Sequence, residues 1–237
     1  MTHLANKRIC KGYLDALAYP GGPGAAVQAF FAPDAVIHAS HPFNDMAGPD
    51  GYQADFLTPL AQAFTGLYRR DFILTAGRYD GADWVTCTGE YAGHFAQDWL
   101  GIPATQTLAY LRVGEFHRME NGQAVESWIY LDIPALMIAA GTWPIKDSPG
   151  RDRGYTGPHR GPATQDGLQL HDNDDGYSAS SAGLVTDMLR KLATPDQAWR
   201  PYWHDNMVWY GPAAFGSFVG LDNFAGFQIP FENAFSH

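Results

Sequence analysis

Residues 106–132 read QTLAYLRVGEFHRMENGQAVESWIYLD, and this stretch decides the fold class. Apolar and polar residues alternate on both sides of Asn121-Gly122, as they do in half-buried strands. An Asn-Gly pair between two such runs is the strongest short-range signal of a two-residue hairpin turn. We therefore predict an antiparallel pair of strands, Gln106–Met119 and Ala124–Asp132.

Two more strands are expected directly before this hairpin. Residues 71–79 and 84–95 follow the same period and are separated by a turn at 80–83. A short apolar helix, residues 133–140, is expected after the hairpin and should end at Gly141.

The first part of the chain reads as helical. Residues 6–31 form two helical pieces broken by the Pro- and Gly-rich run 20–24, and residues 35–39 read as a short strand. Residues 50–64 return to helix, with an apolar stripe that we expect in the core: Tyr52, Phe56, Leu60 and Phe64. Helices followed by an antiparallel sheet predict an α+β domain, in which the helices pack inside or against one face of a curled sheet.

The composition fits a folded, acidic chain. Hydrophobic residues make up 46% of the 237 residues and charged residues 17%, which is too small a charged fraction for a disordered chain. The formal net charge of −10 argues against broad contact with phosphate backbones or anionic membranes, since both need clustered lysine and arginine. The first 20 residues lack the uninterrupted apolar run of a signal peptide. We expect a cytoplasmic protein that binds neither nucleic acid nor membrane.

The chain has two cysteines, Cys10 and Cys87, without CxxC spacing. The sequence therefore predicts neither a disulfide framework nor a thiolate zinc site, and both residues are expected to be small buried apolar side chains.

Three segments are expected along the chain: a complete domain at 1–145, a linker at 146–180, and part of a second copy at 181–237. The linker is rich in Gly, Pro and Asp and has no apolar period. Residues 202–209 repeat the pattern of residues 30–37 at an offset of 172. The second copy ends before its sheet, so we expect either a partial version of a longer protein, which we favour, or a half that docks on the first copy or on another subunit.

Four segments carry a resemblance to a known family. In chain order they read GEYAGHF at 89–95, LGIPAT at 100–105, RVGEFHR at 112–118 and VESWIYLD at 125–132. They resemble the Gly-x-x-x-Gly strand, the Gly-Ile-Pro-x-Thr turn and the closing hairpin with its Trp-x-x-x-Asp ending of SnoaL-like polyketide cyclases, in the NTF2-like superfamily. The repeat also resembles two-copy members often labelled ester cyclases. The resemblance implies an NTF2-like cone that encloses a small-molecule pocket.

The last strand contains the candidate catalytic carboxylate. Alternation places four of its residues on one face: Glu126, Trp128, Tyr130 and Asp132. The two-residue turn would set four residues of the preceding strand opposite them: Leu111, Val113, Glu115 and His117. A carboxylate in a pocket walled by rings loses hydration, which raises its pKa and lets it exchange protons near neutral pH. We predict that Asp132 is catalytic; the alternative is that it caps the helix beginning at Ile133.

The resemblance implies a role for Asp132 as the acid/base that removes a proton next to a carbonyl group and helps to close a ring. The reaction would be an aldol-type step that uses no metal and no organic cofactor. Such chemistry needs hydrogen-bond donors for the oxygen that becomes negative. The candidate donors are Tyr130, Trp128, Tyr91 and His38. Tyr91 stands where family members often carry a histidine.

Four other polar residues allow more than one interpretation. His117 is expected to form an ion pair opposite Glu126. Glu115 would face Trp128, and it is either a second pocket carboxylate or a salt-bridge partner of Arg112 or Arg118. His38 and His41 with Asp45 have the residue types of a metal site, but we expect His38 to line the pocket and His41 to lie at its mouth, and we expect no metal ligands.

Two classes of function remain open from the sequence. One is an enzyme, a cyclase, isomerase or hydrolase that acts on a small hydrophobic carbonyl or ester compound. The other is a non-catalytic module for ligand binding or dimerisation, because the fold alone does not decide between them. The resemblance implies a homodimer, and pairing of the two copies within one chain is the alternative.

Overall fold

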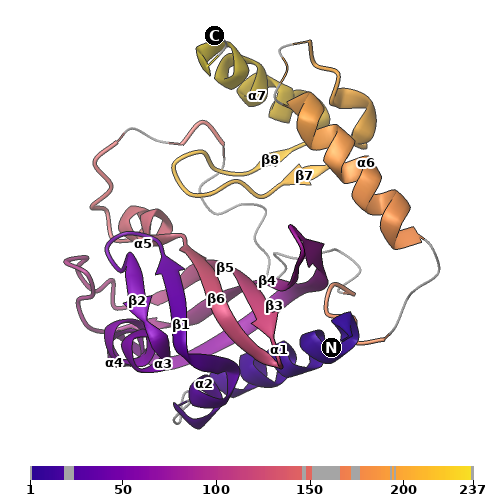
Figure 1. Ribbon diagram of the computed structural model, residues 1–237. Coiled ribbons are helices and arrows are strands. Elements are labelled where there is room, and N and C mark those ends of the chain that lie inside the picture. Colours follow the sequence, from indigo (N-terminus) through magenta and orange to yellow (C-terminus); the bar gives the residue numbers. More distant parts are fainter. Residues whose placement is uncertain are drawn as a thin grey trace. The chain divides into compact units, whose positions relative to one another are not determined.

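This computed structural model describes residues 2–18, 24–145, 148–150, 166–171, 177–192, 194 and 196–235. The chain forms two compact units (Figure 1): Met1–Pro144 with His159–His171 make unit 1, and Ile145–Pro158 with Asp172–His237 make unit 2. The expected linker thus contributes residues to both units. In unit 1 the amide of Leu74 donates to the carbonyl oxygen of Gly167 at 2.9 Å, and in unit 2 the amide of Gly150 donates to that of Phe215 at 2.9 Å.

The helices of unit 1 form where the sequence period predicts them. They are α1 (His3–Leu17), α2 (Gly24–Phe30), α3 (Gly48–Tyr52), a π-helical turn (Gln53–Leu57), α4 (Thr58–Ala63) and α5 (Ile133–Ala139). The stripe expected in the core is buried, with Tyr52, Phe56, Leu60 and Phe64 at most 3% exposed. The helix α5 is followed by Gly141 at a φ of +70°, the left-handed conformation that ends many helices.

A six-stranded sheet completes unit 1 and confirms the α+β class. Its strands are β1 (Phe31–Ala39), β2 (Asp45–Ala47), β3 (Phe64–Tyr79), β4 (Ala82–Phe95), β5 (Leu108–Glu120) and β6 (Gln123–Leu131). Their order is β2-β1-β6-β5-β4-β3, and neighbours are antiparallel except β1 and β6, which are parallel. Two register shifts in β3 increase the local twist and help the sheet to curl.

Two glycines of β4 let β3 approach closely. A Cβ atom on Gly89 would lie 2.5 Å from the carbonyl oxygen of Arg70, and one on Gly93 would lie 3.1 Å from the Cα atom of Leu67. Both contacts are with backbone atoms, which cannot move without disturbing the ladder. The Gly-x-x-x-Gly spacing in the sequence is therefore a packing requirement of this strand pair.

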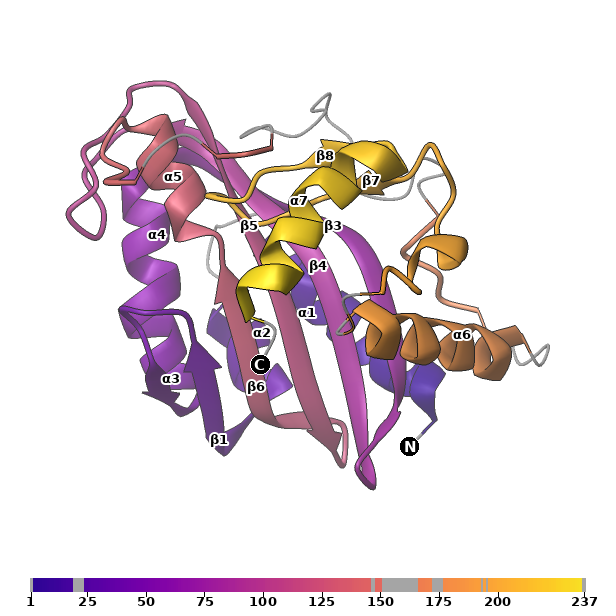
Figure 2. The same ribbon diagram turned by 90° about the horizontal axis from the view of Figure 1, so that it is seen from above.

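The helices cover one face of the sheet, which we call the inner face. Figure 2 shows α1 and α2 behind the long strands, and α1 contacts β3 and β4. Inner-face residues such as Leu111, Val113 and Ile129 are buried in a core that continues into the helices. We call the opposite side the outer face.

The register of the β5–β6 hairpin corrects one expectation. The Asn121-Gly122 turn forms as predicted, with φ values of 50° and 85°. A register shift follows within the next pairs, so that Glu126 lies opposite Arg118 and not opposite His117.

This shift decides which side chains of β6 reach the core. A one-residue change of register exchanges the two faces of a strand. Ile129 and Leu131 therefore point to the inner face and are at most 6% exposed, whereas Trp128 and Tyr130 point to the outer face and are 39% and 55% exposed. The expectation that Trp128 and Tyr130 share a face with Val113 and Glu115 is wrong, because the aliphatic residues of β6 take those positions.

Unit 2 contains a short strand pair between helices. Its elements are α6 (Tyr177–Leu192), a 3-10 turn (Arg200–Tyr202), β7 (Val208–Trp209), β8 (Phe218–Val219) and α7 (Leu221–Phe235). Val208 lies opposite Val219 and Trp209 opposite Phe218. Adding 172 to the pairs of β1 and β2 (36 with 47, 37 with 46) gives these same pairs.

The buried core of unit 2 is small and mainly aromatic. It consists of Trp199, Met207, Phe218, Leu221, Phe224 and Ala225. The helix α6 contributes no buried residue. In the part of the chain that the structure describes, every helix is too short or too polar to cross a membrane.

Candidate functional site

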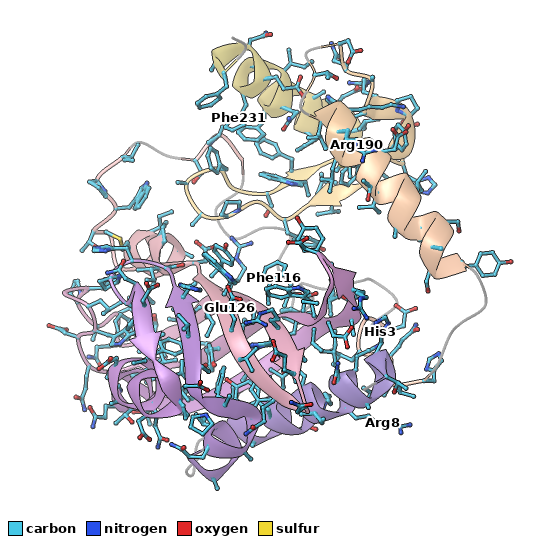
Figure 3. The ribbon with its side chains drawn as sticks, in the orientation of Figure 1. His3, Arg8, Phe116, Glu126, Arg190 and Phe231 are labelled. Atoms are coloured by element: carbon cyan, nitrogen blue, oxygen red, sulfur yellow. The ribbon has the colours of Figure 1, made fainter. Side chains whose placement is uncertain are left out.

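An aromatic cavity opens on the outer face of unit 1. Its volume is about 490 Å³, and its lining residues come from β3 to β6: Tyr79, Trp84, Thr86, Phe116, Trp128 and Tyr130. Cross-strand pairing builds its floor, since Phe116 lies opposite both Thr86 and Trp128. Figure 3 shows Phe116 and Glu126 on the side of the sheet away from α1. Two predicted site residues, Trp128 and Tyr130, therefore come together here, outside the helix-covered interior.

Asp132 lies just beyond β6 and pairs with Arg112. The Arg112 Nε atom donates to Asp132 Oδ2 at 2.9 Å, and Arg112 Nη2 donates to the same oxygen. The Asp132 side chain is 8% exposed. It makes no side-chain cap for α5, because the amide of Ala135 donates to the backbone oxygen of Asp132 at 3.1 Å. Arg112 points to the outer face of β5. Because Asp132 is bonded to Arg112, its carboxylate lies on that side of the sheet and not among the inner-face rings.

Asp132 is the last member of a row of alternating charges across four strands. Arg70 lies opposite Glu90 and donates to its carboxylate at 3.0 Å. Glu90 in turn lies opposite Arg112. Each charge in the row has a neighbour of opposite sign, and this arrangement stabilises cross-strand pairing. Asp132 follows Tyr130, a wall of the cavity, by two residues, and it is not itself a lining residue.

The two predicted histidines occupy different surroundings. The ring of His38 stacks on Trp128 with centroids 4.1 Å apart, and its Nδ1 atom lies 2.6 Å from Asp45 Oδ1. His38 therefore borders the outer-face cavity through Trp128. His41 lies in the turn after β1 and is exposed. His38 thus contacts a wall of the cavity but is not itself a lining residue.

The other two predicted residues, Tyr91 and Glu115, lie in a buried charged cluster on the inner face. Arg69 Nη1 donates to Glu115 Oε1 at 2.6 Å and to the Tyr91 hydroxyl oxygen at 3.0 Å. Arg69 Nε donates to Asp71 Oδ1 at 2.9 Å. The prediction that Glu115 forms a salt bridge with Arg112 or Arg118 is wrong, because both arginines point to the outer face.

His117 completes this cluster. Its Nε2 atom lies 3.1 Å from Glu115 Oε2 and its Nδ1 atom 2.8 Å from Ser127 Oγ. The side chains of Arg69, Glu115 and His117 are all 0% exposed. His117 is an ion-pair residue as expected, but its partner is Glu115 and not Glu126.

The environment separates the pKa values of this pair. Burial would raise the pKa of Glu115, but the Arg69 charge and the His117 hydrogen bond outweigh it and lower the pKa to about 2. Burial would lower the pKa of His117, but hydrogen bonds with Cys87 and Glu115 raise it to about 9. Burial also raises the pKa of Tyr91 to about 12. Since neither member of the ion pair titrates near pH 7, the pair is poorly suited to exchange protons with a substrate there.

The sequence did not lead us to predict Arg69 in the site, and it led us to the wrong partner for Arg112. The charges of the two strands did contain a signal for Arg112. If the strands pair one residue out of the expected register, Arg112 falls opposite Asp132 and Arg118 falls opposite Glu126. Opposite charges then meet, which favours the observed pairing over the expected one. The sequence around Arg69 contains no such signal. Arg69 and Arg70 are adjacent in one strand, and nothing in the sequence indicates which of the two is buried.

Comparisons with known proteins agree with this architecture. No family model matches the sequence, and no curated protein matches it. Among solved structures, a proposed SnoaL-like polyketide cyclase from Jannaschia sp. aligns with a TM-score of 0.50 and 18% identity, over 60% of this chain and 94% of that one. AclR, a proposed hydroxylase from Streptomyces galilaeus, aligns with a TM-score of 0.51 and 17% identity, over 60% of this chain and 100% of that one.

Identities below 20% establish a shared fold and leave the reaction open. The helices, the order of the sheet and these alignments lead to one conclusion. The chain carries the SnoaL-like, NTF2-like fold over about three fifths of its length.

Proposed function

We propose that unit 1 binds a small hydrophobic carbonyl or ester compound in the outer-face cavity and acts on it by cofactor-free acid/base chemistry of the cyclase or isomerase type. The observation that carries this proposal is the aromatic cavity of about 490 Å³, whose wall residue Tyr130 precedes Asp132, the partner of Arg112, by two positions in the chain. A cavity of this size and lining suits a drug-sized apolar molecule, which needs a few polar groups to orient it.

In this proposal Asp132 is the acid/base. Its carboxylate accepts a proton from the carbon next to a carbonyl group, and the resulting enolate carbon attacks a second carbonyl group. The new alkoxide oxygen then takes the proton back from Asp132, so that no atom is lost. The Arg112 guanidinium, which donates to Asp132, and the hydroxyl of the cavity residue Tyr130 would serve as donors for the developing negative oxygen.

The ligand can be identified by fluorescence and thermal shift. Trp84 and Trp128 line the cavity, so we expect aromatic carbonyl compounds to quench tryptophan emission and to raise the melting temperature. Trp128→Ala should weaken binding about 10-fold because a stacking ring is lost. Tyr68→Ala is the matched control, since Tyr68 is equally exposed at 39% but does not line the cavity. Equal loss of binding in both variants would contradict the cavity as the binding site.

Catalysis is tested with Asp132→Asn and the compound found in that screen. We expect kcat to fall about 100-fold or more while the ligand Kd is unchanged, because general acid/base catalysis contributes at least that factor. Glu120→Gln is the control, since Glu120 pairs with Arg118, is exposed and does not line the cavity. Full turnover in Asp132→Asn would exclude the proposed role of Asp132.

The second candidate is a non-catalytic module for binding or dimerisation. It is favoured by the exposed rings of the same face, with Phe116 44% and Tyr130 55% exposed. Light scattering after gel filtration distinguishes a homodimer from a single chain in which the two copies pair. Phe116→Asp should convert a homodimer that uses this face into monomers.

The proposal extends to unit 2 as part of a second SnoaL-like copy of the ester-cyclase kind. It is supported by the identical register of β1–β2 and β7–β8 at an offset of 172. Gly48 and Gly220, which are 172 residues apart, both have positive φ values, 64° and 84°.

A further inference from the structure

The two cysteines of the chain meet a histidine in the interior of unit 1. Cys10 comes from α1, Cys87 from β4 and His117 from β5, and none is more than 1% exposed. One ligand atom from each residue lies within 4.8 Å of the other two. The cluster lies on the inner face of the sheet, opposite the cavity assigned to the proposed function.

The spacing of these atoms is close to that of a metal site. Three atoms at most 4.8 Å apart all lie within about 2.8 Å of a common point, which is 4.8 Å divided by √3. Zinc binds sulfur at about 2.3 Å and imidazole nitrogen at about 2.0–2.1 Å. An inward shift of about half an ångström by each side chain would therefore bring all three to bonding distance.

A carboxylate lies next to two of the three residues, and it would have to move toward Cys10 to become a fourth ligand. Glu115 Oε2 lies 3.1 Å from His117 Nε2 and 3.5 Å from Cys87 Sγ. Two thiolates, one imidazole and one carboxylate make a four-coordinate donor set of the kinds that zinc accepts.

The surroundings of the cluster match those of a ligating histidine. His117 Nδ1 lies 2.8 Å from Ser127 Oγ, and its Nε2 atom lies 3.1 Å from Glu115 Oε2. Metal-bound histidines almost always use their second ring nitrogen in this way. Arg69 Nη2 lies 3.7 Å from Cys87 Sγ. A dication and the Arg69 guanidinium together would balance two thiolates and the Glu115 carboxylate.

We propose that Cys10, Cys87 and His117, with Glu115 as fourth ligand, form a buried site for a zinc-type divalent cation. Binding replaces three protons by the metal: one leaves each thiol and one leaves the His117 imidazolium, while Glu115 binds as a carboxylate. Because all four side chains are buried, the cation would be taken up as α1 packs onto the sheet during folding.

The experiment uses the full chain and the metal alone. The protein is unfolded and refolded with Zn²⁺, with Co²⁺ or with a chelator, and then desalted. We expect about one bound metal per chain by elemental analysis, a near-ultraviolet thiolate-to-cobalt charge-transfer band, and a higher melting temperature than in the chelator-treated protein.

Variants identify the ligands. Cys10→Ser and Cys87→Ser should each lose the cobalt–thiolate band or weaken it markedly, whereas His94→Gln, at an exposed histidine of the same strand as Cys87, should retain it. If a cysteine variant fails to fold, the wild-type band and metal content still decide the question. Less than 0.1 metal per wild-type chain, or a disulfide between Cys10 and Cys87 in the purified protein, would overturn the proposal.

Discussion

Arg69 is the residue on which the inner-face cluster depends. Its guanidinium contacts the carboxylates of Glu115 and Asp71 and is 0% exposed. Arg69→Met would leave two buried carboxylates without their counter-charge, and loss of one partner of a buried pair costs about 3–5 kcal/mol. We expect the free energy of unfolding to fall by that amount in urea denaturation followed by circular dichroism, with a chelator present.

The control is Arg78→Met on the same strand, where the arginine is exposed. It should change the free energy of unfolding by no more than about 0.5 kcal/mol. Adding Glu115→Gln to Arg69→Met should cost less than the sum of the two single changes, because the charge that Arg69 neutralises is then absent. Additive effects would mean that the two side chains do not interact.

At the scale of elements, the shifted register of β5 and β6 decides which residues face the outer side. It places Arg118 opposite Glu126, with Arg118 Nε donating to Glu126 Oε2 at 2.9 Å. A double-mutant cycle with Arg118→Ala and Glu126→Ala should give a coupling of about 0.5 kcal/mol, typical of an exposed pair. The cycle of Arg112→Ala with Glu126→Ala is the control and should show no coupling, since Arg112 pairs with Asp132. Absence of coupling between Arg118 and Glu126 would contradict the shifted register.

At the scale of the whole molecule, the two units differ in how much core they bury. Unit 1 has one continuous core that joins the inner face to the helices, whereas the core cluster of unit 2 has six buried residues among those the structure describes. Local stability follows the amount of buried apolar contact. In hydrogen exchange on the full chain, we expect the amides of α6 to have protection factors about 100-fold lower than those of β4 and β5. Equal protection in α6 and β4 would contradict this difference.

Local patterns in the sequence were sufficient for the class of the fold. The Asn121-Gly122 turn, the buried stripe of Tyr52, Phe56 and Leu60, and the glycine after α5 all depend on residues close together in the chain. Turn chemistry and side-chain period act over a few residues, so they can be read before any tertiary contact is known.

The site depended on contacts that no local pattern contains. One extra residue in β6 turned Trp128 and Tyr130 outward and left Asp132 beside Arg112, while Arg69 of the distant strand β3 reached Glu115. Sequence determined the strands, their turn and their core-forming period, because these follow from neighbouring residues. Only the tertiary structure decided the face of each carboxylate and the meeting of Cys10, Cys87 and His117, because register and burial depend on which side chains from distant segments fill the same space.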